Sequence, residues 1–173
     1  PPPPCTYLLS RPGALLVPPA HRARVWAMGA GRTAKAAFCM TGDGRVIGAI
    51  VRGDFDVNET KLVNAVKAIG GLRPATVEEI KARGMEPGYG SPIGARDATV
   101  VVDELAAQSP NLVAGANKEG FHLLNANVGR DFTPDQVIDI ANVRGGDPCP
   151  QCGMPLKLSK GTSVGHHFKP VTD

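Results

Sequence analysis

The chain has 173 residues and a net charge of +3; 42% of its residues are hydrophobic and 20% are charged. This length suits one domain with a real core, and the composition is ordinary for a soluble globular protein. No apolar run reaches the ~20 residues that span a bilayer, the start does not resemble a signal peptide, and four cysteines are too few for a disulfide scaffold. We therefore expect a cytoplasmic protein with reduced thiols and no membrane partner. The mild basic balance is compatible with a polyanionic partner.

The N-terminal segment, residues 1–31, is rich in proline and has no clean periodicity. Prolines at positions 1–4 favour polyproline II, and Pro12, Pro18 and Pro19 interrupt any regular element. We expect irregular or disordered structure here. Because the chain starts with Pro rather than Met, we also expect a fragment of a longer protein.

Regular elements are predicted from about Thr33 onward. Two apolar runs, 36–40 and 45–51, flank a glycine-containing loop and predict a β-hairpin. Apolar residues at helical spacing predict a helix over 57–69, ended by two glycines. Thr76 and Glu79 form the pattern of a capping box that opens a second, short helix.

The second half of the chain predicts short strands over 98–103, 112–114 and 121–126. The loop 87–92 contains two prolines and two glycines and is too irregular for a helix or strand. Segment 133–143 suits either a helix or a strand. The fold class predicted from these elements is mixed α/β (α+β), with short strands and few helices.

Standard catalytic signatures are absent from the sequence: it has no Walker loop, no G-x-S-x-G and no H-E-x-x-H. Instead, seven segments occur in a distinctive order. They are 33–35 (TAK), 52–62 (RGDFDVNETKL), 88–92 (GYGSP), 101–103 (VVD), 115–122 (GANKEGFH), 146–153 (GDPCPQCG) and 161–168 (GTSVGHHF).

In this order the segments resemble the insertion, or editing, domain of bacterial-type prolyl-tRNA synthetases, a member of the YbaK-like deacylase family. The resemblance covers about residues 32–168, whereas 1–31 and 169–173 do not match. It implies a mixed, partly barrel-shaped sheet flanked by helices. The implied domains are an unmatched segment 1–31, the editing domain 32–147, and an exit segment 148–173 that leads back toward the aminoacylation domain.

The resemblance implies hydrolysis of alanine wrongly attached to proline tRNA. A proline pocket excludes the smaller alanine by only ~1–3 kcal/mol per missing methylene, so fidelity needs a second site. Ester hydrolysis there needs a positioned water and oxyanion stabilisation, and no cofactor. ATP and Mg²⁺ are expected only in the aminoacylation domain of the parent enzyme. The expected partners are the 3′ end of tRNA(Pro) carrying alanine and the rest of a homodimeric synthetase.

The catalytic residues implied by the resemblance are Lys35, three residues of the loop (Gly88, Gly90 and Pro92), and His122. Lys35 would grip the terminal nucleotide, the loop would offer backbone N–H groups to the ester carbonyl, and His122 would limit the size of the amino acid. Without the resemblance, the same residues suit a solvated strand-edge lysine, a plain surface turn and a core histidine.

Four further residues are implied to contact the substrate: Tyr89, Ser91, Asp103 and Asn117. Asp103 follows the predicted strand 98–103, where a carboxylate can orient a loop or a water molecule. An ordinary strand-end turn accounts for it equally well.

Cys149 and Cys152 form a C-x-x-C pair that supplies half of a zinc site. Zinc needs four ligands, and a single pair indicates it only weakly. Two other functions fit the sequence less closely. One is a free-standing YbaK-like deacylase, which would not need the exit segment. The other is a non-catalytic zinc- or RNA-binding module.

Overall fold

The computed structural model describes residues 8–9, 15–17, 29–149 and 151–161. The chain divides into two compact units, Pro1–Asn142 and Val143–Asp173. The candidate pocket, whose lining residues run from Gly29 to His122, belongs to the first unit.

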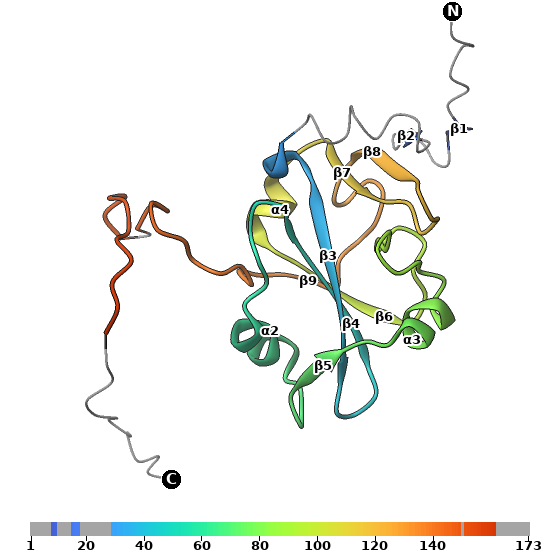
Figure 1. Cartoon of the computed structure of the whole chain (residues 1–173), viewed down its shortest axis with the longest axis horizontal. Coiled ribbons are helices and arrows are strands. Elements are labelled where there is room, and N and C mark those ends of the chain that lie inside the picture. Colours follow the sequence, from blue (N-terminus) through green and yellow to red (C-terminus); the bar gives the residue numbers. More distant parts are fainter. Residues whose placement is uncertain (1–7, 10–14, 18–28, 150, 162–173) are drawn as a thin grey trace, which may run out of the picture. The chain divides into compact units, whose positions relative to one another are not determined.

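A five-stranded mixed sheet forms the centre of the first unit (Figure 1). Its order is β5-β3-β4-β6-β9, in which β4–β6 and β6–β9 are parallel and the other pairs antiparallel. The strands are β3 (Ala34–Thr41), β4 (Val46–Arg52), β5 (Leu72–Pro74), β6 (Ala98–Val102) and β9 (Gln136–Val137).

A second, four-stranded antiparallel sheet has the order β1-β2-β8-β7. Its strands are β1 (Leu8–Leu9), β2 (Leu15–Val17), β7 (Leu112–Gly115) and β8 (His122–Ala126). The mixed α/β prediction is confirmed, but neither sheet closes into a barrel among the described residues, and an isolated parallel bridge between Thr33 and Val113 links the two sheets. The strands β1 and β2 lie in the segment that we expected to be irregular. They form because β2 pairs with β8, more than 100 residues later, and β1 pairs with β2.

The predicted hairpin is β3 and β4, paired from Ala34↔Arg52 to Met40↔Val46. One face of this pair packs Ile47, Ala49 and Val51 against Leu62 and Val66 of the helix α2 (Glu59–Val66). That helix ends earlier than predicted because Lys67 adopts a left-handed conformation with φ of 49°.

Two short helices complete the first unit, together with the 3-10 turn η2 (Ala30–Arg32). The helix α3 (Val77–Ala82) has the predicted capping box between Thr76 and Glu79. The helix α4 (Glu104–Gln108) was not predicted and is capped by Asp103. Among the described helices, none has the length and apolar character needed to cross a bilayer.

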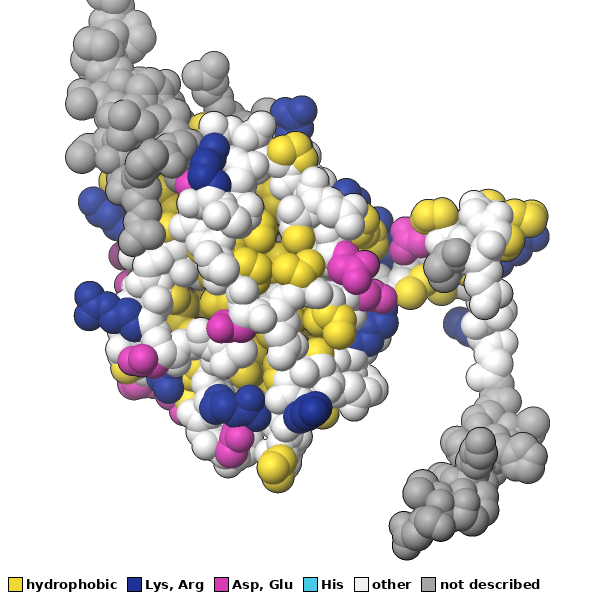
Figure 2. All heavy atoms as spheres, turned by 180° about the vertical axis from the view of Figure 1, so that it is seen from behind, with side chains coloured by type: hydrophobic (Ala, Val, Ile, Leu, Met, Phe, Trp, Pro, Cys, Tyr) yellow, Lys and Arg dark blue, Asp and Glu magenta, His cyan; other side chains and the backbone are white. Residues whose placement is uncertain are grey.

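Seen from behind, hydrophobic side chains gather at the middle of the first unit's surface, with acidic and basic side chains around them (Figure 2).

The other face of the β3–β4 hairpin also contributes to a buried cluster. There Ile50, Val100, Val102 and Ala106 form a second cluster, against which Val128 and Phe132 pack.

Candidate functional site

A pocket of about 620 Å³ lies beside the N-terminal half of β3. It brings together segments that are far apart in sequence: β3, the loop 87–90, and the ends of β7 and β8. Its lining residues are Gly29, Ala30, Thr33, Ala34, Lys35, Ala36, Phe38, Ile80, Pro87, Gly88, Gly90, Val113, Ala114, Gly115 and His122. Four of the five expected catalytic residues (Lys35, Gly88, Gly90 and His122) are among them.

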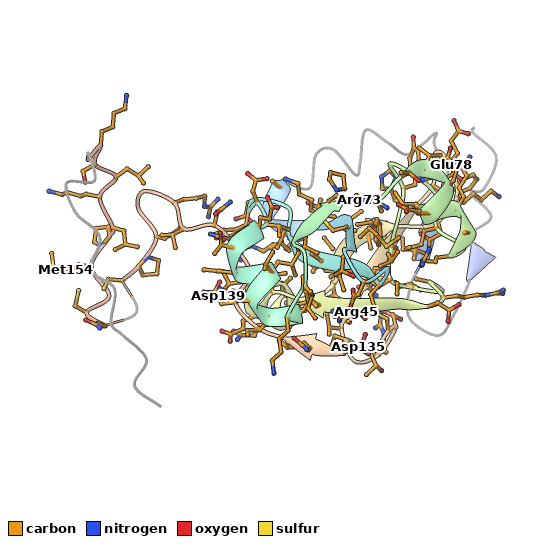
Figure 3. All side chains as sticks on the ribbon, turned by 90° about the horizontal axis from the view of Figure 1, so that it is seen from below. Arg45, Arg73, Glu78, Asp135, Asp139 and Met154 are labelled. Atoms are coloured by element: carbon orange, nitrogen blue, oxygen red, sulfur yellow. The ribbon has the colours of Figure 1, made fainter. Side chains whose placement is uncertain are left out.

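A second hollow, of about 430 Å³, lies at the turn end of the β3–β4 hairpin. Its lining includes Arg45 and Asp135, labelled in Figure 3, together with Arg83 and Asp97. No residue expected in the site lines it. The pocket beside β3 is therefore the candidate site.

The loop at residues 88–92 contributes main-chain groups to the pocket. The amide of Tyr89 donates to Glu86 O at 2.9 Å, and that of Ser91 donates to Asn117 Oδ1 at 2.8 Å. The amides of Gly88 and Gly90 have no hydrogen-bond partner within the part of the chain that the structure describes. Both residues line the pocket, so the loop places two N–H donors that have no acceptor in the described chain at the pocket wall.

Close packing explains why glycine occupies two wall positions. A Cβ at Gly90 would lie 2.4 Å from the Phe38 ring, and a Cβ at Gly115 would lie 2.2 Å from Tyr89 O. Such contacts are too short for any side chain. The absence of side chains lets β7 and the loop approach each other and leaves backbone exposed to the pocket.

Lys35 lines the pocket, but its ammonium is paired with the carboxylate of Asp56. Hydrogen bonding to Lys35 lowers the pKa of Asp56 below its ordinary value. Side chains alternate along a strand, and the neighbours Ala34 and Ala36 pack on the opposite face from Ala37. Lys35 therefore points to the face of Ala37, opposite the face on which Ala34 and Ala36 line the pocket, and half of its side chain is exposed (51%).

His122 lies at the start of β8 and lines the pocket. Its ring meets that of Tyr89 edge to face, with centroids 5.7 Å apart. Tyr89 does not line the pocket but contacts His122 in the edge-to-face geometry that aromatic pairs prefer.

The remaining expected residues lie beside the pocket or away from it. Ser91 and Pro92 line a small neighbouring cavity. Asn117 does not line the pocket and instead binds the loop through Ser91 and Ile93. Asp103 is buried, and its carboxylate accepts bonds from three backbone amides: Leu105, Ile140 and Ala141. The Asp103 carboxylate thus caps α4 and binds the backbone of residues 140–141.

The apolar wall of the pocket was not expected from the sequence. Ala34, Ala36 and Phe38 alternate along β3, and Val113 and Ala114 of β7 also line the pocket. Period-two spacing along 34–38 was the available signal, because every second residue of a strand faces the same side.

In the second unit, Cys149 and Cys152 lie in a tight turn, where Gly153 N donates to Cys149 O at 2.8 Å. Backbone hydrogen bonds from residues 152 and 151 lower the pKa of the Cys149 thiol. In the described part of the chain, no group of three potential metal ligands forms. The pair supplies two of the four ligands that zinc requires.

The model of the aminoacyl-tRNA editing domain family matches residues 19–132. The chain is 49% identical over 167 residues to a proline–tRNA ligase of Salinispora tropica, covering 96% of this chain and 27% of that enzyme. It is 45% identical to a proline–tRNA ligase of Dehalococcoides mccartyi, covering 79% of this chain and 24% of that enzyme. The chain therefore spans about a quarter of the length of these relatives.

The fold also occurs in solved structures. One protein, described as a candidate trans-editing enzyme for prolyl tRNA synthetase, has a TM-score of 0.62 and 20% identity over 75% of this chain and 87% of that chain. The hypothetical protein APE2540 has a TM-score of 0.58 and 17% identity over 73% of this chain and 90% of that chain. The family match covers more than half of the sequence and includes every strand of the candidate pocket, so the chain belongs to the aminoacyl-tRNA editing domain family, whose members deacylate aminoacyl-tRNA.

Proposed function

We propose that this chain is the editing domain of a bacterial-type proline–tRNA ligase and that it hydrolyses the ester of alanine wrongly attached to tRNA(Pro). The identities to proline–tRNA ligases support the parent enzyme. In this proposal the rest of a homodimeric cytoplasmic synthetase carries the ATP- and Mg²⁺-dependent ligation of proline.

The observation that carries the proposal is that the amides of Gly88 and Gly90, two residues of the pocket wall, donate to no acceptor in the described chain. Water attacks the ester carbonyl carbon, and the negative charge that develops on the carbonyl oxygen accepts hydrogen bonds from these N–H groups. The carbon–oxygen bond to the ribose then breaks. The ribose oxygen takes a proton, and alanine leaves with the second oxygen supplied by the water.

Lys35 binds the tRNA end in this proposal. The phosphate of the terminal nucleotide replaces Asp56 as the partner of the ammonium, which exchanges one charge-assisted bond for another. The exchange is accessible because both side chains are largely exposed, and an exposed ion pair is worth little on its own.

His122 limits the size of the amino acid. Its ring is braced by Tyr89, so it forms a stiff wall opposite the apolar residues of β3. Alanine passes this wall, whereas the ring of proline is excluded.

The proposal is tested by comparing Gly88→Ala with Gly94→Ala in single-turnover hydrolysis of alanyl-tRNA(Pro). Both glycines have positive φ (80° and 86°), and an added Cβ would meet no atom within 4 Å at either. The backbone strain of alanine is therefore similar, at about 1–3 kcal/mol. Only Gly88 lines the pocket. We expect a loss of at least about 10-fold for Gly88→Ala and little change for Gly94→Ala; equal effects would contradict the role of the loop amides.

A further inference from the structure

Cys149 and Cys152 lie at the tip of a short hairpin in the second unit. Pro148 and Pro155 form an antiparallel bridge just before the tip. Inside that bridge, the Cys149 amide donates a hydrogen bond to Met154 O at 2.9 Å. The backbone on both sides of the two cysteines is therefore held in place by the fold of the chain itself.

The turn at this tip brings the two thiols together. The Gly153 amide closes it by donating to Cys149 O at 2.8 Å, and Gly153 has a φ of 71°, which favours glycine. The Cys149 sulfur accepts hydrogen bonds from the backbone amides of Cys152 and Gln151, and it is also hydrogen-bonded to the Cys152 thiol. The two sulfurs therefore lie close to each other, and backbone N–H groups point at the first of them.

This arrangement is a donor set for a thiophilic cation. Cysteine thiolate is a preferred ligand of Zn²⁺ and of softer cations such as Cu⁺. Hydrogen bonds to a ligand atom orient it and tune the metal, as outer-shell partners do in metal sites. Cys152 is exposed and Cys149 is half-buried, so a cation reaches the pair from solvent.

We propose that Cys149 and Cys152 form a two-thiolate site that binds one Zn²⁺ per chain. Each thiol releases its proton as its sulfur bonds to zinc, so two S–Zn bonds replace two S–H bonds. Zinc takes four ligands, and no group of three potential ligands forms among the described residues. Water, or a group from outside that part of the chain, takes the other two positions.

The proposed site is independent of the proposed editing function. The residues that line the pocket beside β3 run from Gly29 to His122 and belong to the first unit, whereas the two cysteines belong to the second. Zinc bound at the cysteines therefore supplies nothing to the ester hydrolysis. Alanine release should be the same in Cys149→Ser as in the wild type, with or without zinc.

The test is a titration of the reduced chain with Co²⁺, which replaces Zn²⁺ and reports thiolate ligands by a charge-transfer absorption band. We expect the band to saturate at one Co²⁺ per chain and to disappear when Zn²⁺ is added. Loss of an outer-shell partner alone costs roughly 10- to 100-fold in metal affinity, so Cys149→Ser and Cys152→Ser should each weaken binding at least about 10-fold. The matched control is Cys39→Ser, which removes a half-buried thiol of β3 and should leave the titration unchanged.

Gly153→Ala tests the turn without removing a sulfur, and Gly129→Ala in the first unit is its control. Both glycines have positive φ (71° and 83°), and an added Cβ would meet no atom within 4 Å at either. We expect Gly153→Ala to weaken Co²⁺ binding about 10-fold and Gly129→Ala to leave it unchanged. A wild-type chain without the thiolate band, or one whose affinity survives both cysteine substitutions, would overturn the site. Equal affinities in the two glycine variants would show that the turn does not prepare the sulfurs.

Discussion

Asn117 and Ser91 are joined by two reciprocal hydrogen bonds: the Ser91 amide donates to Asn117 Oδ1 at 2.8 Å, and Asn117 Nδ2 donates to Ser91 O at 3.0 Å. Asn117 Nδ2 also donates to Ile93 O at 2.9 Å, and the Asn117 amide donates to Tyr89 O at 2.9 Å. Asn117, two residues after the end of β7, therefore holds the loop that presents the Gly88 and Gly90 amides. This clamp explains how a glycine-rich loop keeps a defined shape.

Replacing Asn117 tests that clamp. Asn117→Ala leaves the amide of the buried Ser91 without a partner, which costs ~1–3 kcal/mol of stability. We expect kcat to fall, because the two glycine amides are no longer held in place, while KM changes little. Asn117→Asp keeps the acceptor for the Ser91 amide and should lose less. A lower melting temperature with an unchanged kcat would mean that the clamp serves folding alone.

Lys35→Ala should lower the rate of alanine release at least ~10-fold, because a charge-assisted hydrogen bond is worth ~1.5–3 kcal/mol. Stability should change little, since the ion pair with Asp56 is exposed. Asp56→Asn removes the same pair but leaves the ammonium, so this control should remain active. Equal rates in wild type and Lys35→Ala would assign Lys35 to the surface only.

His122→Ala should widen the pocket without removing the loop amides. We expect it to retain some alanine hydrolysis and to gain activity toward correctly charged prolyl-tRNA(Pro). If the side chain instead served packing, the variant would lose ~2–5 kcal/mol of stability with no change in preference. Both deacylation rates, measured beside a melting curve, distinguish these results.

The capping box of α3 predicts a specific dependence of stability on pH. Hydrogen bonding to Arg73, followed by the Thr76 amide, lowers the pKa of Glu79 from 4.5 to about 2. The stabilisation by ionised Glu79 is therefore complete above pH ~4.5 and is lost as the pH falls toward ~2. The difference in unfolding free energy between wild type and Glu79→Gln should shrink over this window. Thr76→Ala, which removes the capping hydroxyl, should cost ~0.5–2 kcal/mol throughout. A Glu79→Gln difference that stays constant down to pH 2 would refute the assignment.

Local signals in the sequence predicted the local structure well. The β3–β4 hairpin and the Thr76–Glu79 capping box depend on neighbouring residues and were confirmed. The strands β1 and β2 were missed because β2 pairs with β8, which lies far along the chain, and β1 pairs with β2. Lys35 and His122, which the family resemblance supplied, both line the pocket, and their roles there stay predictions.

The parts of the site that could not be predicted depend on contacts between distant segments. Asp103 ends a strand and looked available for substrate, but residues 140–141 return to bury its carboxylate. The apolar wall combines β3 with β7, which approach each other at the isolated bridge between Thr33 and Val113, 80 residues apart in the chain. Alanine and valine residues carry no chemical signature, so only their arrangement in space reveals the apolar wall.

The most direct test of the central claim is the ratio of deacylation rates for alanyl-tRNA(Pro) and prolyl-tRNA(Pro), measured with the wild-type chain with and without EDTA. The main-chain amides supply the oxyanion stabilisation and the pocket walls supply selectivity. The account therefore predicts release of alanine, sparing of proline at least ~10-fold, and no effect of EDTA. Equal hydrolysis of the two esters, or activity abolished by EDTA, would contradict it.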